Sequence, residues 1–161
     1  MINFYSESIP FTLKNKIKIR NWILAAFKKE KKNSDAISFI FCNDSFLLKL
    51  NKSYLNHDYY TDIITFDYTQ NADLKKYRLR DLKISTNLQI NKSTNPISGD
   101  IFISIQRVKD NAMKFDKTFL NELHRVIIHG VLHLIGYNDT NDQEKKLMTS
   151  KEDYYLSLLE I

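Results

Sequence analysis

The sequence predicts a single α+β domain in which a small mixed β-sheet is covered by helices. Its 161 residues are enough for one domain with a substantial core. Short runs rich in β-branched and aromatic residues occur among longer amphipathic runs, which is typical of strands packed against helices. Only three glycines and two prolines are present, so the composition argues against a collagenous or linker-like chain. We expect one domain over residues 1–161, with a polar insertion at about 70–97.

The first third of the chain is expected to supply two strands and two helices. β-Branched and aromatic runs indicate the strands, and apolar residues at helical spacing indicate the helices. Asn43 or Asp44 is expected to cap the second helix, because short polar side chains accept hydrogen bonds from exposed backbone N–H groups. In chain order the elements are a strand at 2–5, a helix at 12–31, a strand at 37–43 and a helix at 45–55.

The remainder is expected to complete the sheet and then become helical. A polar segment at about 70–97 separates two predicted strands, and its length indicates a lid or surface excursion. Within it, the stretch KISTNLQI (83–90) leaves a further strand open. The expected elements are strands at 62–68 and 99–105 and helices at 108–115, 117–135 and 143–160.

Charge and cysteine content restrict the partners and the compartment. The formal charge of +5 favours polyanionic partners, because contacts with phosphates release counterions, and such binding weakens as salt rises. The single Cys42 excludes a disulfide within the chain, fits a reducing cytosol and is expected to be buried. The start of the chain does not resemble a signal peptide, and no run of about 18 apolar residues occurs, so we expect a cytoplasmic protein without membrane contact.

The most specific stretch is HGVLHLIGYND, residues 129–139. On a helix, His129 and His133 project from the same face and can reach a single cation. Gly136 can adopt the left-handed conformation that closes the helix, which would bring Asp139 back towards the pair. Two imidazoles and a carboxylate suit Zn²⁺ or another divalent ion, with one position left for water. His129 and His133 would then act in catalysis through the metal-bound water.

Alternative roles remain open for these residues. Asp139 could instead cap a helix that begins near Thr140. His124 is five positions before His129 and lies well round the helix, so we assign it to the surface or to the second shell. The spacing also matches metal-dependent peptidases, but these carry a glutamate base where this chain has Gly130, which makes a peptidase a poor first choice.

The motif resembles that of the bacterial rRNA maturation factors of the YbeY type. The resemblance continues in LNKSYLNHDYYTDIITF (50–66) and SGDIFIS (98–104), and in Met148 and Glu152. It implies a single-domain, metal-dependent endoribonuclease that acts on ribosomal RNA and the small ribosomal subunit.

The chain departs from that family pattern at two positions. Asp139 stands where the family usually has a third histidine, and Leu55 stands where it tends to have an arginine. His57, Arg125 or a lysine could replace that arginine in holding phosphate.

Three functions follow as hypotheses from these observations. The first is hydrolysis of single-stranded RNA during ribosomal RNA maturation and quality control. The second is a metal-stabilised ribosome-assembly or RNA-binding factor with little turnover, and the third is a metallopeptidase-like hydrolase. For the first, we expect the histidines to face a cleft bordered by strand 100–104 and residues 50–60. The rings of Tyr54, Tyr59 and Tyr60 could stack on bases there or pack in the core.

Overall fold

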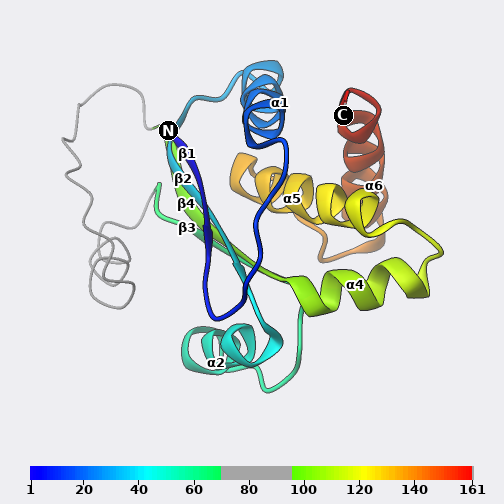
Figure 1. Ribbon diagram of the computed structural model, residues 1–161. Helices are drawn as coiled ribbons and strands as arrows, with labels where there is room; N and C mark the ends of the chain where they lie inside the picture. The colour runs from blue at the N-terminus through cyan, green and yellow to red at the C-terminus, as the bar shows by residue number, and fades with distance from the viewer. Residues whose placement is uncertain (70–95, 161) are drawn as a thin grey trace.

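The computed structural model describes residues 1–69 and 96–160 and contains one four-stranded sheet (Figure 1). Its order is β1-β2-β4-β3, with β2 parallel to both β1 and β4, and β3 antiparallel to β4. The mixed sheet is therefore confirmed. The strands are β1 (Ile2–Ser6), β2 (Ser34–Cys42), β3 (Ile63–Asp67) and β4 (Ile97–Ser104).

Five helices accompany the sheet in the described residues, and each corresponds to a predicted helix. They are α1 (Lys16–Lys29), α2 (Asp44–Leu55), α4 (Ile105–Lys114), α5 (Phe119–Ile135) and α6 (Asp142–Ser157). α1 begins later than expected, because Asn15 adopts a left-handed backbone with φ 53° just before it. Asn43 caps α2, accepting a hydrogen bond from the backbone N–H of Phe46 at 2.8 Å. The expected insertion and the possible strand at 83–90 lie almost entirely outside the described residues.

The core is divided by the sheet into a large cluster and a small one. The large cluster joins the sheet to α1, α5 and α6, and the small one lies under α2 (Figure 1). Within β2, Phe39 and Phe41 belong to the large cluster, whereas Ile40 and Cys42 belong to the small one. A strand buried on both faces reads as a continuous apolar run, which is how this stretch was identified. The predicted burial of Cys42 is confirmed.

The helix α5 lies at the centre of the large cluster. Thr118 caps its first turn by accepting a hydrogen bond from the backbone N–H of Asn121 at 3.1 Å. Apolar side chains all round the helix are buried, which is the pattern of a core helix. The helix ends at Gly136, whose φ of 113° is left-handed as predicted. In the part of the chain that the structure describes, no helix has the length and apolarity needed to cross a bilayer.

Candidate metal centre

Three potential metal ligands converge at the C-terminal end of α5. The Nε2 atoms of His129 and His133 lie 2.9 Å apart. The Oδ2 atom of Asp139 lies 3.7 Å from the first and 3.8 Å from the second. Because Gly136 reverses the chain between them, a carboxylate ten residues after His129 returns to the same point.

The hydrogen bonds of the two rings fix which nitrogen of each faces this point. His133 Nδ1 lies 3.0 Å from the backbone oxygen of Tyr137, which can only accept a hydrogen bond, so Nδ1 carries the proton. His129 Nδ1 lies 2.7 Å from Glu152 Oε1, which favours a proton on this nitrogen as well. In the neutral rings, the two Nε2 atoms that carry the lone pairs then lie 2.9 Å apart. Two lone pairs 2.9 Å apart repel unless a proton or a metal cation lies between them.

The spacing of the three donor atoms fits a small divalent ion. The circle through the two Nε2 atoms and Asp139 Oδ2 has a radius of about 2.0 Å, close to the zinc–nitrogen and zinc–oxygen bond lengths of about 2.0–2.2 Å. Among residues 1–69 and 96–160, these three form the one group of three or more His, Cys, Asp or Glu side chains gathered closely enough to hold an ion. A three-ligand group leaves a coordination position open, as catalytic zinc sites do.

Glu152 on α6 orients His129 and was not identified by spacing. Its carboxylate accepts hydrogen bonds from His129 Nδ1 at 2.7 Å and from Arg125 Nη1 at 2.9 Å. Such carboxylate–histidine pairs fix the ring and make it a stronger ligand. Only the family resemblance singled out Glu152, because it lies 23 residues beyond His129 on a different helix.

The two imidazoles have opposite tendencies to hold a proton when no metal is present. Burial lowers the pKa of His129, but the hydrogen bond and charge of Glu152, with Asp139, outweigh it and raise the pKa above its ordinary value. Burial and the neighbouring His129 lower the pKa of His133. In the metal-free protein, a proton shared by the pair is therefore held mainly on His129.

The backbone position that carries a glutamate in peptidases faces the sheet in this fold. A Cβ atom added to Gly130 would lie 2.8 Å from Ile101 Cγ2 and 2.8 Å from Ile63 Cδ1. These side chains come from β4 and from β3, which packs against α5. A glutamate at this position would start towards the sheet and crowd these two isoleucines, which argues against a peptidase mechanism.

The alternative role of Asp139 as a helix cap is wrong. Asn141 caps α6, its side chain accepting a hydrogen bond from the backbone N–H of Glu144 at 3.0 Å. The Asp139 carboxylate instead faces the two histidines.

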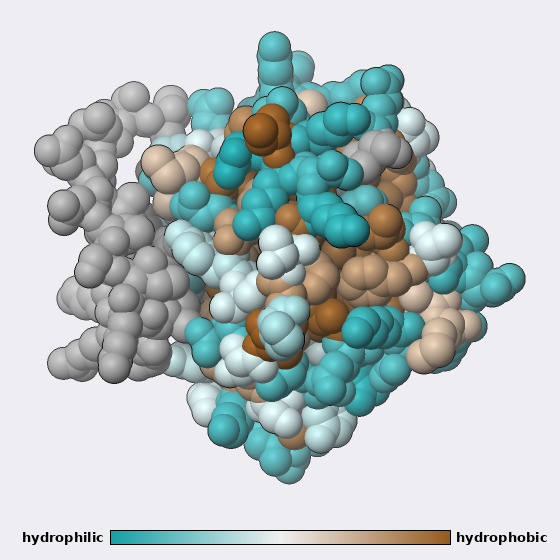
Figure 2. Space-filling model, viewed as in Figure 1, coloured by the Kyte–Doolittle hydropathy of each residue, from teal (hydrophilic) through white to brown (hydrophobic). Residues whose placement is uncertain are grey.

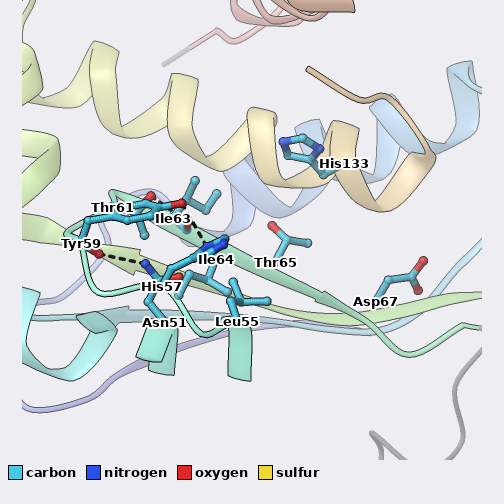
Figure 3. A pocket seen from close by; sticks show the side chains of 10 residues that line it. All are labelled: Asn51, Leu55, His57, Tyr59, Thr61, Ile63, Ile64, Thr65, Asp67 and His133. Carbon is cyan, nitrogen blue, oxygen red and sulfur yellow. Dashed lines mark hydrogen bonds between the residues drawn. The ribbon is translucent and has the colours of Figure 1, made fainter. Parts of the chain in front are cut away.

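A cleft of about 340 Å³ opens beside His133 (Figure 3). His133 on α5 forms one wall, and the end of α2, the following loop and β3 form the other. We expected strand 100–104 at this border, and that was wrong: β3 is the edge strand and separates β4 from the cleft. The expected border from residues 50–60 is present. The lining residues are Asn51, Leu55, His57, Tyr59, Thr61, Ile63, Ile64, Thr65, Asp67 and His133.

Comparison with known proteins identifies the family of this chain. The family model described as Endoribonuclease YbeY matches residues 1–160. The chain belongs to the YbeY endoribonuclease family. It is 44% identical to the Endoribonuclease YbeY of Karelsulcia muelleri over 159 residues, covering 99% of this chain and 96% of the relative. It is also 44% identical to that of Cytophaga hutchinsonii, covering 98% and 94%.

One solved structure has a similar fold. The solution structure of TM1509 from Thermotoga maritima aligns with a TM-score of 0.55 at 24% identity, covering 99% of this chain and 89% of that one. At this level of identity the likeness concerns the fold alone.

Leu55, at the position where the family tends to have an arginine, lies on the wall of this cleft. Of its possible substitutes, His57 also lines the cleft and contacts the Tyr59 hydroxyl through Nδ1 at 3.0 Å. Arg125 is paired with Glu152 at 2.9 Å and Asp153 at 2.7 Å. His57 is therefore the better candidate.

The three tyrosines near the cleft and His124 differ in their surroundings. Tyr59 and Tyr60 are more than half exposed, so core packing does not account for them. Tyr54 is less exposed, and its ring packs edge-on against Phe66 of β3, with ring centres 5.5 Å apart, as the packing alternative expects. Tyr60 lies under the Arg107 guanidinium, 4.8 Å from its ring centre. Our assignment of His124 to the surface or the second shell was wrong: it is buried, and its ring packs edge-on against Trp22 of α1.

Proposed function

We propose that residues 1–161 form a single metal-dependent endoribonuclease domain that hydrolyses phosphodiester bonds in single-stranded RNA. The observation that carries this proposal is the convergence of two oriented Nε2 atoms and the Asp139 carboxylate beside an open cleft. Membership of the YbeY endoribonuclease family supports the reaction. We assign His129, His133 and Asp139 as the ligands of one Zn²⁺ per chain.

Different residues of the chain have different roles at such a site. When bound, a divalent ion polarises a phosphate oxygen and makes water a nucleophile near neutral pH. Glu152 and the Tyr137 carbonyl engage the Nδ1 atoms of the two imidazoles, which leaves the Nε2 atoms as those that would hold such an ion. His57 offers a side-chain donor to a phosphodiester in the cleft. The exposed Tyr59 ring can stack on an unpaired base, which favours single strands over duplexes.

We further propose ribosomal RNA in the small subunit as the substrate and the cytoplasm as the compartment. The resemblance of residues 129–139 to the rRNA maturation factors supports this target. The net charge of +5 suits a polyanionic partner, and the single reduced Cys42 suits a reducing compartment. On the face shown in Figure 2, hydrophilic side chains surround a central area of hydrophobic ones.

The proposal is tested by incubating zinc-loaded protein with end-labelled single-stranded RNA, duplex RNA and casein. We expect cleavage of the single strand, slower cleavage of the duplex, and no cleavage of casein. His129→Ala should abolish the ribonuclease activity, whereas Asp153→Asn, a matched change on the exposed side of Arg125, should not. Proteolysis of casein, or full metal occupancy without any RNA cleavage, would contradict the proposal.

A further inference from the structure

A second polar cluster lies behind the metal centre, where the end of α1, the turn after α5 and α6 meet. Glu30, the residue that ends α1, accepts a hydrogen bond on Oε2 from the Tyr137 hydroxyl at 2.9 Å. On Oε1 it accepts from Lys151 Nζ at 2.8 Å and from the Tyr155 hydroxyl at 2.5 Å. One carboxylate thus joins three elements that are distant in sequence.

The surroundings of Glu30 make it a charged anchor. Its side chain is only 15% exposed. Burial raises the pKa of this carboxyl, but the three donors and the charge of Lys151 outweigh it, so the pKa lies below its ordinary value. Lys151 Nζ also lies 5.1 Å from the centre of the Tyr137 ring. The Tyr137 side chain is therefore held at its hydroxyl by an anion and over its ring by a cation.

Tyr137 connects this anchor to the metal centre through its backbone. Its carbonyl oxygen accepts the hydrogen bond from His133 Nδ1, which keeps the other nitrogen free for an ion. The preceding Gly136 is exposed, with open space where a Cβ atom would stand, so side-chain packing at this residue does not hold the turn. The backbone N–H groups of Gly136 and Tyr137 both bond to the Leu132 carbonyl of α5, at 3.1 and 3.0 Å, and the Tyr137 hydroxyl adds an attachment outside α5. Asp139 follows two residues later.

We propose that Glu30 and Tyr137 are positioning residues of the metal centre. By anchoring the Tyr137 ring, Glu30 fixes the carbonyl that selects the tautomer of His133 and holds the turn that presents Asp139. Neither side chain touches the three ligands, so both act through the backbone of the turn. This inference rests on the proposed metal centre.

The test measures Co²⁺ and Zn²⁺ dissociation constants by competition titration in Tyr137→Phe, Glu30→Gln and Tyr155→Phe. The last variant is the matched control, because it removes a tyrosine–Glu30 hydrogen bond that does not lead to the metal centre. Partners bonded directly to a ligand change metal affinity by about 10- to 100-fold, so one step further out we expect about tenfold weakening in the first two variants. The control should stay within twofold of the wild type.

Ring-nitrogen NMR of the metal-free protein gives a second readout. The wild type should show His133 protonated at Nδ1 when neutral, and Tyr137→Phe should shift the ring towards the other tautomer. Wild-type affinity and tautomer in both Tyr137→Phe and Glu30→Gln, or equal weakening in Tyr155→Phe, would overturn the inference. Failure of the wild type to bind either ion would contradict the metal centre instead, and the tautomer shift would then decide the positioning role alone.

Discussion

Glu152→Gln should weaken metal binding without unfolding the protein. The Glu152 side chain is only 9% exposed and accepts hydrogen bonds from His129 and Arg125 at 2.7 and 2.9 Å. Loss of a group that is hydrogen-bonded to a metal ligand costs about 10- to 100-fold in metal affinity, equivalent to about 1.4–2.8 kcal/mol. Glutamine keeps one acceptor oxygen but loses the charge, so we expect about tenfold. Glu152→Ala should approach 100-fold.

The assay is competition titration of Zn²⁺ against a chelator of known affinity, with circular dichroism to check folding. Asp153→Asn is the control, because Asp153 also pairs with Arg125, at 2.7 Å, but is 61% exposed and has no contact with the histidines. It should bind Zn²⁺ within twofold of the wild type. Unchanged affinity in Glu152→Gln, or an equal loss in Asp153→Asn, would refute the role assigned to Glu152.

Three further predictions concern the same region. Asp139→Ala should weaken metal binding and ribonuclease activity together. Asp139→His should retain the metal and move the pH–rate profile to lower pH. Unchanged Zn²⁺ affinity in Asp139→Ala would show that this residue is not a ligand. In metal-free protein, the raised pKa of His129 means that protonation of this ring stabilises the fold fully below the ordinary pKa of about 6.5, and that this stabilisation is lost as pH rises through the pKa of the folded state. The difference in free energy of unfolding between the wild type and Glu152→Gln, measured with denaturant, should therefore shrink from pH 5.5 to 8. A constant difference would contradict this. Gly130→Ala should lower the free energy of unfolding by about 1 kcal/mol and leave the metal stoichiometry unchanged. Overpacking against Ile63 and Ile101 costs about 1–3 kcal/mol, and the gain in helix propensity offsets about 1 kcal/mol of this cost. A stabilised variant would show that the contacts with Ile63 and Ile101 relax freely.

The sequence predicts those features that depend on local spacing. His129, His133 and Gly136 lie on or next to one helix, and helical periodicity alone brings the two imidazoles together. The strands were recognised from their apolar and β-branched runs, and the cap of α2 from Asn43. Each of these needs only a few neighbouring residues.

The features that could not be predicted depend on tertiary contacts. Glu152 contacts His129 from α6, and Glu30 contacts Tyr137 from the end of α1, and nothing in their spacing indicates either contact. The wrong strand was placed at the cleft because the sheet order is not sequential, with β3 outside β4. The assignment of His124 was wrong because α1 covers that side of α5 with Trp22. The spacing of residues within α5 does not indicate which other helix packs on it.

The most direct test of the metal centre is elemental analysis of the purified protein and its variants. Wild type and Asp153→Asn should each hold about one divalent ion per chain, and His129→Ala or His133→Ala should release most of it. The same preparations should lose cleavage of single-stranded RNA in parallel with the ion. Full occupancy in the His129→Ala/His133→Ala double variant would contradict the site.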